Sequence, residues 1–324
     1  MSPGPPVREP EGGLESGPGA SEASRASGLV IVDKPGGMTS HDVVAQVRRL
    51  AGTRKVGHAG TLDPMATGVL VVGVEKATRL LGYLTLTEKE YDATIRLGQS
   101  TSTDDAEGEI TGGATAAGVS ATVLTQHQLS EAVAGLTGQI EQVPPAVSAI
   151  KVDGQRAYRL TRAGAAPELK SRPVTVCEFT VTGTRHDGDL LDVDATVRCS
   201  SGTYIRALAR DLGAALGTGG HLTRLRRTRV GGYRIEDART LEQLAERFEV
   251  LPLARAAAAA FPSRKLTADE ARRLAHGGRL AASTASTGAA QAGPATAAAY
   301  APDGTLIALV AEESGQARPL VVFA

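Results

Sequence analysis

The sequence predicts an α+β fold, in which a mixed and mainly antiparallel sheet is flanked by helices and is followed by a small β domain. Strand-like and helix-like segments alternate along the chain, but they do not form the regular βαβ units of a doubly wound fold. The 324 residues, of which 42% are hydrophobic, suffice for one large domain and a smaller one. A helical segment and a hairpin after residue 261 predict the separate β domain.

The first ordered segment is a short strand at residues 29–32, and it ends in a Pro-Gly-Gly turn at 33–37. A helix follows, because apolar residues recur there at helical spacing. We expect Ser40 to be its N-cap and Gly52 to end it.

The remaining segments are assigned by their hydrophobic periodicity. A continuous apolar run predicts a buried strand, strict alternation predicts a half-buried strand, and a spacing of three or four predicts a helix. In chain order these segments are a buried strand at 69–74, a short helix at 77–84, an alternating strand at 89–97, a helix at 129–136, strands at 174–179 and 191–197, helices at 207–216 and 266–274, and a hairpin over 300–323 around Asp303-Gly304.

Three domains or segments are expected. Residues 1–27 are rich in Gly, Pro, Ser and Glu, so we expect a disordered tail. Residues 28–260 form the main domain, with a basic excursion from its core at 138–172, and residues 261–324 form the C-terminal domain. Within the latter, 281–299 is a low-complexity stretch of Ala, Ser, Thr and Gly.

Several classes of protein are disfavoured. No apolar run approaches the length of about 20 residues that spans a bilayer, and no signal peptide begins the chain, so we expect a cytoplasmic protein with no membrane partner. Cys177 and Cys199 have no metal-type spacing and are expected to be reduced core thiols rather than a disulfide. The six histidines are scattered, which argues against a metal site.

Two further motifs carry no ligand-binding signature. The acidic cluster at 103–108 lacks the alternating ligands of a calcium loop, so a solvated turn is expected there. Neither the glycine spacing of a P-loop nor that of a dinucleotide-binding turn is present.

The net charge of zero hides an uneven distribution of arginines. Between residues 198 and 234 a single acid, Asp211, accompanies eight arginines, which are Arg198, Arg206, Arg210, Arg224, Arg226, Arg227, Arg229 and Arg234. A basic face that binds phosphates is therefore expected, and its affinity for nucleic acid should fall with salt. The alternative is a solvated arginine-rich surface with ordinary ion pairs, which would be expected to bring more acids with it.

The most informative segment is GHAGTLDPMATG at 57–68. Its glycines permit sharp turns and the close approach of a ligand. Pro64 favours an extended backbone at the preceding residue, so Asp63 is presented from a non-helical loop. The buried strand that follows would anchor this loop to the sheet, which is typical of an active site.

Four motifs in order closely resemble those of the TruB family of bacterial tRNA pseudouridine-55 synthases. They are KPGGMTS at 34–40, GHAGTLDPMATG at 57–68, KEYDA at 89–93 and SGTYIR at 201–206. The resemblance covers residues 28 to about 235 and implies the pseudouridine synthase fold. It also implies an isomerase that converts the T-loop uridine of tRNA to pseudouridine without a cofactor.

By its position in the motif, Asp63 is the catalytic carboxylate that this resemblance implies. Breaking an N-glycosidic bond and forming a C-glycosidic one requires a carboxylate beside the sugar and the base. Whether Asp63 acts as a nucleophile or as a base stays open. A pocket that excludes water disfavours the ionised form, so a close arginine is needed, and Arg206 is the expected partner.

The target uridine must be flipped out of its loop and held against aromatic and apolar surfaces. The resemblance assigns Tyr91 to stacking and to removal of the C5 proton, and it places Tyr204 and Leu225 in the same pocket. His58 is expected to stack in the space that the uridine leaves. Lys34 is expected to support the pocket rather than to perform chemistry.

The excursion at 138–172 resembles the RNA-gripping insertion of the bacterial family members, and Lys151 and Arg156 are its expected substrate contacts. The segment after residue 261 resembles the small PUA-like β domain of the family. The expected partner is the T arm of tRNA, bound by a monomer.

Two alternatives remain. The chain could be a tRNA-binding or tRNA-folding protein that acts independently of catalysis, and this role can coexist with the enzyme. A small-molecule hydrolase that uses Asp63 would leave the arginine-rich segment unexplained.

Overall fold

The computed structural model describes residues 27–113, 120–147, 151–152, 155–156, 169–282, 295–313 and 315–323. Apart from Ser27, the tail predicted at 1–27 lies outside the described residues, as do 283–294 of the low-complexity stretch.

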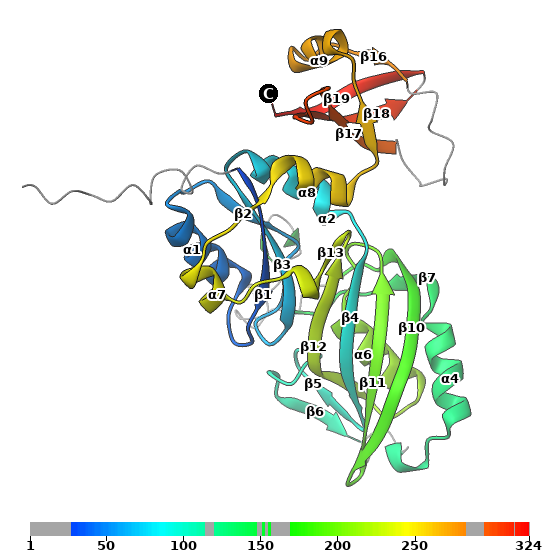
Figure 1. Ribbon diagram of the computed structural model, residues 1–324. Helices are drawn as coiled ribbons and strands as arrows, with labels where there is room; N and C mark the ends of the chain where they lie inside the picture. The colour runs from blue at the N-terminus through cyan, green and yellow to red at the C-terminus, as the bar shows by residue number, and fades with distance from the viewer. Residues whose placement is uncertain are drawn as a thin grey trace, which may run out of the picture.

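One large sheet forms the main body of the molecule (Figure 1). Its pairs are antiparallel except for a short parallel pairing of β3 with β12, so the predicted mixed, mainly antiparallel α+β architecture is confirmed. In spatial order the strands are β14 (Leu251–Pro252), β1 (Gly28–Lys34), β3 (Thr67–Val74), β12 (Gly220–Val230), β4 (Lys89–Leu97), β11 (Leu190–Cys199), β10 (Arg172–Asp187) and β7 (Gly138–Gln142), with β2 (Val56–Ala59) paired to β3 and β13 (Tyr233–Arg234) paired to β12.

Helices cover this sheet differently in its two halves. Around β1 and β3, α1 (Ser40–Ala51) and α7 (Leu241–Glu246) pack on one face. The other face is covered by η2 (Glu75–Leu80), α2 (Leu81–Thr85) and α8 (Leu253–Ala260). In the second half, α4 (Gln126–Gly135) and α6 (Ile205–Ala215) pack against β4, β10, β11 and β12.

Helix α1 begins one residue earlier than predicted. Thr39 is its N-cap and forms a capping box with Asp42, so the assignment of Ser40 was wrong. The Ser40 side chain is buried and exchanges hydrogen bonds with the backbone of Leu62, next to Asp63. Gly52 ends the helix in the left-handed conformation, as predicted.

Strand β12 lies near the middle of the sheet and was missed in the sequence. Its sequence GHLTRLRRTRV contains four arginines, a composition that is rare in a central strand. The structure accommodates Arg227 at 1% exposure because its guanidinium donates to three backbone carbonyls.

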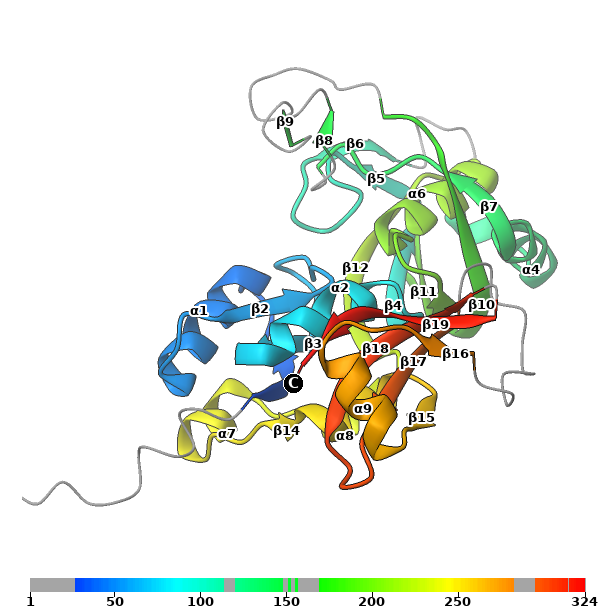
Figure 2. The same ribbon diagram turned by 90° about the horizontal axis from the view of Figure 1, so that it is seen from above.

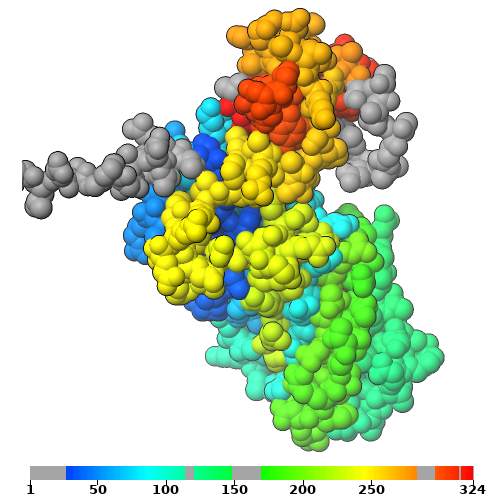
Figure 3. All heavy atoms as spheres, viewed as in Figure 1, coloured from blue at the N-terminus to red at the C-terminus, as the bar shows by residue number. Residues whose placement is uncertain are grey.

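A second sheet follows the main one and packs on it through α8, η2 and α2 (Figures 1 and 2). Its strand order is β15 (Ser263–Lys265), β17 (Ala295–Tyr300), β18 (Leu306–Glu313), β19 (Gln316–Val322) and β16 (Leu280–Ala281), and α9 (Ala268–Ala275) packs on it. The predicted helix is confirmed, and so is a hairpin around Asp303-Gly304. The predicted bounds of the hairpin were wrong, because its first strand begins at Ala295, inside the expected low-complexity stretch, and β19 adds a third strand. The space-filling view shows this unit seated on the segment of α8 (Figure 3).

Two short hairpins complete the described structure. One pairs β5 (Gln99–Thr101) with β6 (Ile110–Gly113), and its turn contains the acidic cluster at 103–108. The other pairs β8 (Lys151–Val152) with β9 (Gln155–Arg156), inside the predicted 138–172 excursion. Two 3-10 turns, η3 (Ala121–Val123) and η4 (Ile235–Asp237), lie in connections.

Candidate active site

The loop between β2 and β3 presents Asp63, and a buried arginine holds its first half. Arg227 donates to the carbonyls of Gly60 at 3.1 Å and Thr61 at 3.3 Å. Gly68, where β3 begins, has a φ of +100°, and a Cβ there would lie 2.2 Å from the Arg227 carbonyl. Only glycine permits this close approach of β3 to β12, which brings Arg227 under the loop.

The second half of the loop is held by Lys34 and Ser40. Lys34 Nζ donates to the Pro64 carbonyl at 3.1 Å, and Ser40 Oγ binds the backbone of Leu62. Burial lowers the pKa of Lys34 to about 8, although the nearby charge of Asp63 opposes this effect. Buried side chains therefore fix the backbone on both sides of Asp63. Lys34 contributes a hydrogen bond to the backbone carbonyl of Pro64.

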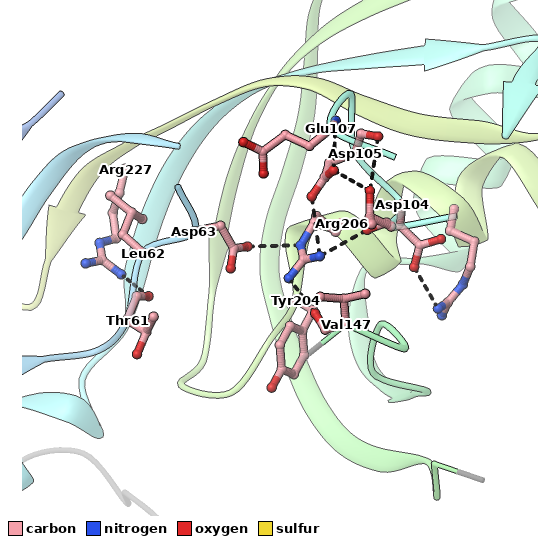
Figure 4. Close-up of polar contacts among 12 residues, drawn as sticks. Thr61, Leu62, Asp63, Asp104, Asp105, Glu107, Val147, Tyr204, Arg206 and Arg227 are labelled. Atoms are coloured by element: carbon pink, nitrogen blue, oxygen red, sulfur yellow. Dashed lines mark hydrogen bonds and ion pairs between the residues drawn. The ribbon is translucent and has the colours of Figure 1, made fainter. Parts of the chain in front are cut away.

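The expected ion pair between Asp63 and Arg206 forms. Arg206 Nε lies 2.9 Å from Asp63 Oδ2, and Arg206 is 5% exposed at the start of α6. Its Nη1 lies 3.3 Å from Asp105 Oδ2 and donates to the carbonyl of Thr103, while its Nη2 donates to the carbonyl of Val147. Figure 4 shows the two carboxylates reaching Arg206 from different sides.

This ion pair leaves hydrogen-bonding groups of both Arg206 and Asp63 unused. The buried Nε–H of Arg206 has no acceptor in good hydrogen-bond geometry, despite the short distance to Asp63. The Asp63 side chain retains 34% of its exposure. The carboxylate is thus held next to a cation while one side stays open to a ligand.

Asp105 was missed in the sequence, where the cluster at 103–108 was expected to be a solvated turn. The segment is a turn with Ala106 and Glu107 exposed, but the expectation was wrong for Asp105, which is 3% exposed and accepts hydrogen bonds from Thr103 Oγ1 and from the backbone N–H of Glu107. Asp104 beside it pairs with Arg210 of α6 at 3.2 Å. An acidic cluster with glycine looks the same in the sequence whether it is solvated or folded onto cations.

Tyr91 lies on β4 with its ring in the core that also contains Leu62 and Leu225. It is 7% exposed, and burial raises the pKa of its hydroxyl, an effect that the nearby Arg227 opposes. Tyr91 is therefore protonated at neutral pH and suited to packing and hydrogen bonding. Leu225, on β12, is 5% exposed and adds to the same apolar surface.

Tyr204 is the N-cap residue of α6, directly before the helix that carries Arg206. Gln142, at the end of β7, binds the backbone of Tyr204 twice. Its Nε2 donates to the Tyr204 carbonyl at 3.1 Å, and its Oε1 accepts from the Tyr204 N–H at 2.8 Å. Gln142 is 1% exposed and was missed, because one glutamine at a strand end carries no sequence signal.

His58 lies on β2, before the Asp63 loop, and its ring stacks edge-on against that of His41 at a centroid distance of 5.5 Å. Burial, followed by the nearby His41 and Arg227, lowers the pKa of His58, so its ring is neutral at neutral pH. Its buried Nδ1 has no hydrogen-bond partner among the described residues. The structure shows no direct contact of His58 with Asp63.

Lys151 and Arg156 face each other across the β8–β9 hairpin, but their side chains lie outside the described part of the structure. The described segment at 143–147 precedes this hairpin, and Val147 contacts Arg206 through its carbonyl. The base of the excursion therefore lies beside Asp63.

The arginine-rich segment is not the unpaired basic face that the sequence predicts. Five of its eight arginines form ion pairs: Arg198 with Glu88 and Glu178, Arg206 with Asp63 and Asp105, Arg210 with Asp104 and Asp211, Arg226 with Asp33, and Arg229 with Glu88 and Glu90. The acids come mostly from other parts of the chain, which a local count of charges misses. In the described part of the chain, Arg224, Arg227 and Arg234 form no ion pair.

The described residues include no group of three His, Cys, Asp or Glu side chains placed to hold a metal ion. They also contain no helix long and apolar enough to cross a membrane. Cys177 and Cys199 are both free thiols, and burial raises the pKa of Cys199 to about 11.

Three family profiles match consecutive parts of the chain. The profile of the "TruB family pseudouridylate synthase (N terminal domain)" matches residues 48–205. The "tRNA pseudouridylate synthase B C-terminal domain" matches 206–257, and "tRNA Pseudouridine synthase II, C terminal" matches 261–324. Together these profiles cover well over half of the sequence.

Similar proteins and solved structures agree with these profiles. The chain is 63% identical over 303 residues to the tRNA pseudouridine synthase B of Thermobifida fusca (strain YX), covering 92% of this chain and 99% of that protein. It is 61% identical over 301 residues to the synthase of the same name from Arthrobacter sp. (strain FB24), covering 92% and 97%.

Among solved structures, a Cbf5-Nop10-Gar1 complex contains a chain with a TM-score of 0.68 and 26% identity, covering 93% of this chain and 85% of that one. An H/ACA RNP bound to a substrate RNA containing 2'-deoxyuridine shares the fold with a TM-score of 0.65 and 24% identity, covering 92% and 85%. The predicted pseudouridine synthase fold is thus confirmed. With these matches along nearly its whole length, the chain belongs to the TruB family of pseudouridylate synthases, which are isomerases.

Proposed function

We propose that this protein converts the T-loop uridine of tRNA, position 55, to pseudouridine, with Asp63 as the catalytic carboxylate and without a cofactor. The observation that carries the proposal is the ion pair of Asp63 with the buried Arg206 on a loop fixed by Arg227 and Lys34. The names of the relatives support tRNA as the substrate.

The reaction conserves all atoms of the uridine. The bond from N1 to the ribose C1′ breaks, the base turns, C5 bonds to C1′, and the proton leaves C5 while N1 gains one. A carboxylate beside C1′ can either bond to the sugar or remove a ribose proton, and both roles require the ionised form. Arg206 stabilises negative charge on Asp63. The negative charge of Asp105 offsets the positive charge of the guanidinium on its other side.

The pocket for the flipped base is formed by Tyr91, Tyr204 and Leu225. Tyr91 and Leu225 supply apolar surface from adjacent strands, and Tyr204 lies at the start of α6, next to the helix turn that carries Arg206. Stacking on such surfaces offsets the cost of unstacking, which is a few kcal/mol. The protonated Tyr91 hydroxyl can donate a hydrogen bond to the base.

Binding of the T arm is assigned to residues around this pocket. The neutral ring of His58 fills the space left by the uridine, and Lys34 supports the loop from beneath. Lys151 and Arg156, on the hairpin that follows the 143–147 segment, contact phosphates. A single copy of the chain contains all these residues, so we propose that the monomer is active.

The test uses T-arm RNA that carries tritium at C5 of its uridine, because that proton must leave. Wild type should release tritium, and Asp63→Asn, which keeps the shape but removes the charge, should lower the rate at least 10³-fold. Asp303→Asn is the matched control, since Asp303 is an exposed turn residue of the second sheet. RNA binding is measured in parallel by filter retention.

Each outcome decides one assignment. A wild-type protein that binds the RNA and releases no tritium contradicts the isomerase and leaves RNA binding or folding as the function. Release by Asp63→Asn at the wild-type rate shows that Asp63 is misassigned. If Asp63→Asn binds RNA and still promotes its folding, the second function coexists with catalysis.

A further inference from the structure

Helix α6 carries two arginines one turn apart, Arg206 and Arg210, which project from the same side of the helix. Only Arg206 contacts Asp63. Arg210 lies away from the reacting groups, and its side chain is 30% exposed. Neither the sequence motifs nor the proposed chemistry gives Arg210 a role.

The two arginines bind the same two segments in parallel. Within the turn at 103–105, Arg206 binds Thr103 and Asp105, and Arg210 binds the Asp104 carboxylate at 3.2 Å. Within the segment at 143–147, Arg206 Nη2 donates to the Val147 carbonyl at 3.1 Å and Arg210 Nη2 donates to the Val143 carbonyl at 2.8 Å. Each arginine thus links both segments to α6.

The turn needs this second anchor. Asp104 has a φ of +60°, a left-handed conformation that is strained for a residue other than glycine. Its carboxylate is largely buried, with 15% of the side chain exposed, and Arg210 is the cation that pairs with it. Burial raises the pKa of Asp104, and the charge of Arg210 opposes that rise most strongly. Without Arg210, both the strain and the buried charge favour opening of the turn.

The consequence reaches the active site through the backbone. Asp105 follows Asp104 directly, so movement of Asp104 displaces the carboxylate that contacts Arg206 Nη1. Movement of the 143–147 segment likewise displaces the carbonyl that accepts from Arg206 Nη2. Arg206 would then lose two of the groups that fix its guanidinium beside Asp63.

We propose that Arg210 is a positioning residue for the isomerisation, which holds the Asp105 turn and the base of the RNA-gripping excursion on α6 and thereby sets the geometry of Arg206 at Asp63. This inference rests on the function proposed above. Arg210 does not touch the reacting atoms, and its effect is transmitted through Asp104 and Val143.

The experiment measures single-turnover tritium release at saturating T-arm RNA, together with the RNA Kd, for Arg210→Ala, Arg210→Lys and Asp104→Asn. Arg210→Ala should lower the rate about tenfold, because displacements of about 1 Å at a catalytic group cost up to a hundredfold. The Kd should change about twofold or less, because the arginine is held by protein acceptors. Arg210→Lys should recover part of the rate through its remaining pair with Asp104.

Arg96→Ala is the matched control. Arg96 is similarly exposed, at 25%, and likewise pairs with two carboxylates, Asp187 and Asp192, on the face of β4 opposite to Tyr91. Its loss should leave the rate unchanged. Asp104→Asn keeps the side-chain shape and replaces Arg210→Ala in the test if that variant does not fold. It should also lower the rate of tritium release.

A double-mutant cycle with Asp105→Asn separates positioning from general destabilisation. If Arg210 acts through the Asp105 turn as well as through Val143, Arg210→Ala should cost clearly less than tenfold in the Asp105→Asn background. An equal loss in both backgrounds, a wild-type rate for Arg210→Ala, or a loss no larger than that of Arg96→Ala would overturn the inference. Absence of tritium release by wild type would instead refute the proposed function itself.

Discussion

At the scale of single residues, the setting of Asp63 is made by side chains from distant parts of the chain. Arg206 contacts its carboxylate and is itself paired with Asp105, and Lys34 and Arg227 bind the backbone on either side of it. A buried charge that loses its partner is strongly destabilised, so each of these residues depends on the others. These contacts hold the loop, so the carboxylate is placed before any substrate arrives.

Gln142 offers a test of this pre-organisation. Gln142→Ala removes the two hydrogen bonds to the Tyr204 backbone, and stability should fall by about 1–3 kcal/mol because a buried donor and acceptor lose their partners. Urea denaturation followed by circular dichroism measures this, since the chain contains no tryptophan. Gln139→Ala, on the exposed side of the same strand, should change stability by about 0.5 kcal/mol or less. Equal losses in the two variants would contradict the role assigned to Gln142.

At the scale of elements, β12 and β4 organise the site. Strand β12 pairs antiparallel with β4 along its length and parallel with β3 for two residue pairs. That short parallel contact, made possible by Gly68, brings Arg227 beneath the Asp63 loop. The same strand places Leu225 beside Tyr91 of β4 in one apolar core.

Lys89, the first residue of β4, gives a pH prediction at this scale. Its Nζ donates to the carbonyls of Thr85 and Thr87 at the end of α2, and burial lowers its pKa from 10.5 to about 8, with Arg227 adding to the effect. Between pH 8 and 10.5 the unfolded chain therefore holds more protons at Lys89 than the folded chain, so the stability contributed by this residue rises with pH.

The measurement compares wild type with Lys89→Met by urea denaturation at pH values of about 7.5 and 9.5. The stability of wild type relative to the variant should be greater at the higher pH by about 1–2 kcal/mol, since one pKa unit corresponds to about 1.4 kcal/mol. The comparison cancels titrating groups that do not interact with Lys89. The charge of the Cys199 thiol couples to Lys89, and the effect of Cys199 on stability has the opposite sign. The prediction is contradicted if the difference in stability between wild type and Lys89→Met stays constant or falls as the pH rises.

At the scale of the whole molecule, the two sheets share one apolar core. Leu309 and Phe323 of the second sheet belong to the same buried cluster as Leu80 and Leu84 beneath the main sheet. Hydrogen bonds cross the junction, from Lys76 Nζ to the Phe323 carbonyl and from other side chains to the last strand. The two units should therefore unfold together.

Phe323→Ala tests this coupling. Phe323 is 2% exposed, so its truncation should lower stability by about 3–5 kcal/mol, through lost burial and the cavity that remains. The unfolding transition, followed by circular dichroism, should stay single and move to lower urea. Leu86→Ala, at an exposed leucine, should change the free energy of unfolding by about 0.5 kcal/mol or less. Two separate transitions, of which only one responds to Phe323→Ala, would show that the sheets fold independently.

The sequence by itself determined the features that depend on local pattern. It determined the loop that carries Asp63 and the buried apolar strand that follows it, the alternating strand of Tyr91, the stop at Gly52 and the family, whereas strand β2 before that loop was not predicted. These follow from hydrophobic periodicity, turn residues and motifs, which lie within a few neighbouring positions.

Only the tertiary structure decided which charges meet. It placed Asp105 against Arg206 and Arg227 under the Asp63 loop, and it paired most arginines of the basic segment with acids from other segments. The interaction of two charges depends on their separation and burial in space, and neither quantity is encoded in the spacing of residues along the chain. For that reason the sequence singled out Asp63 as the proposed catalytic carboxylate, whereas the fold determined what holds it in place and balances its charge.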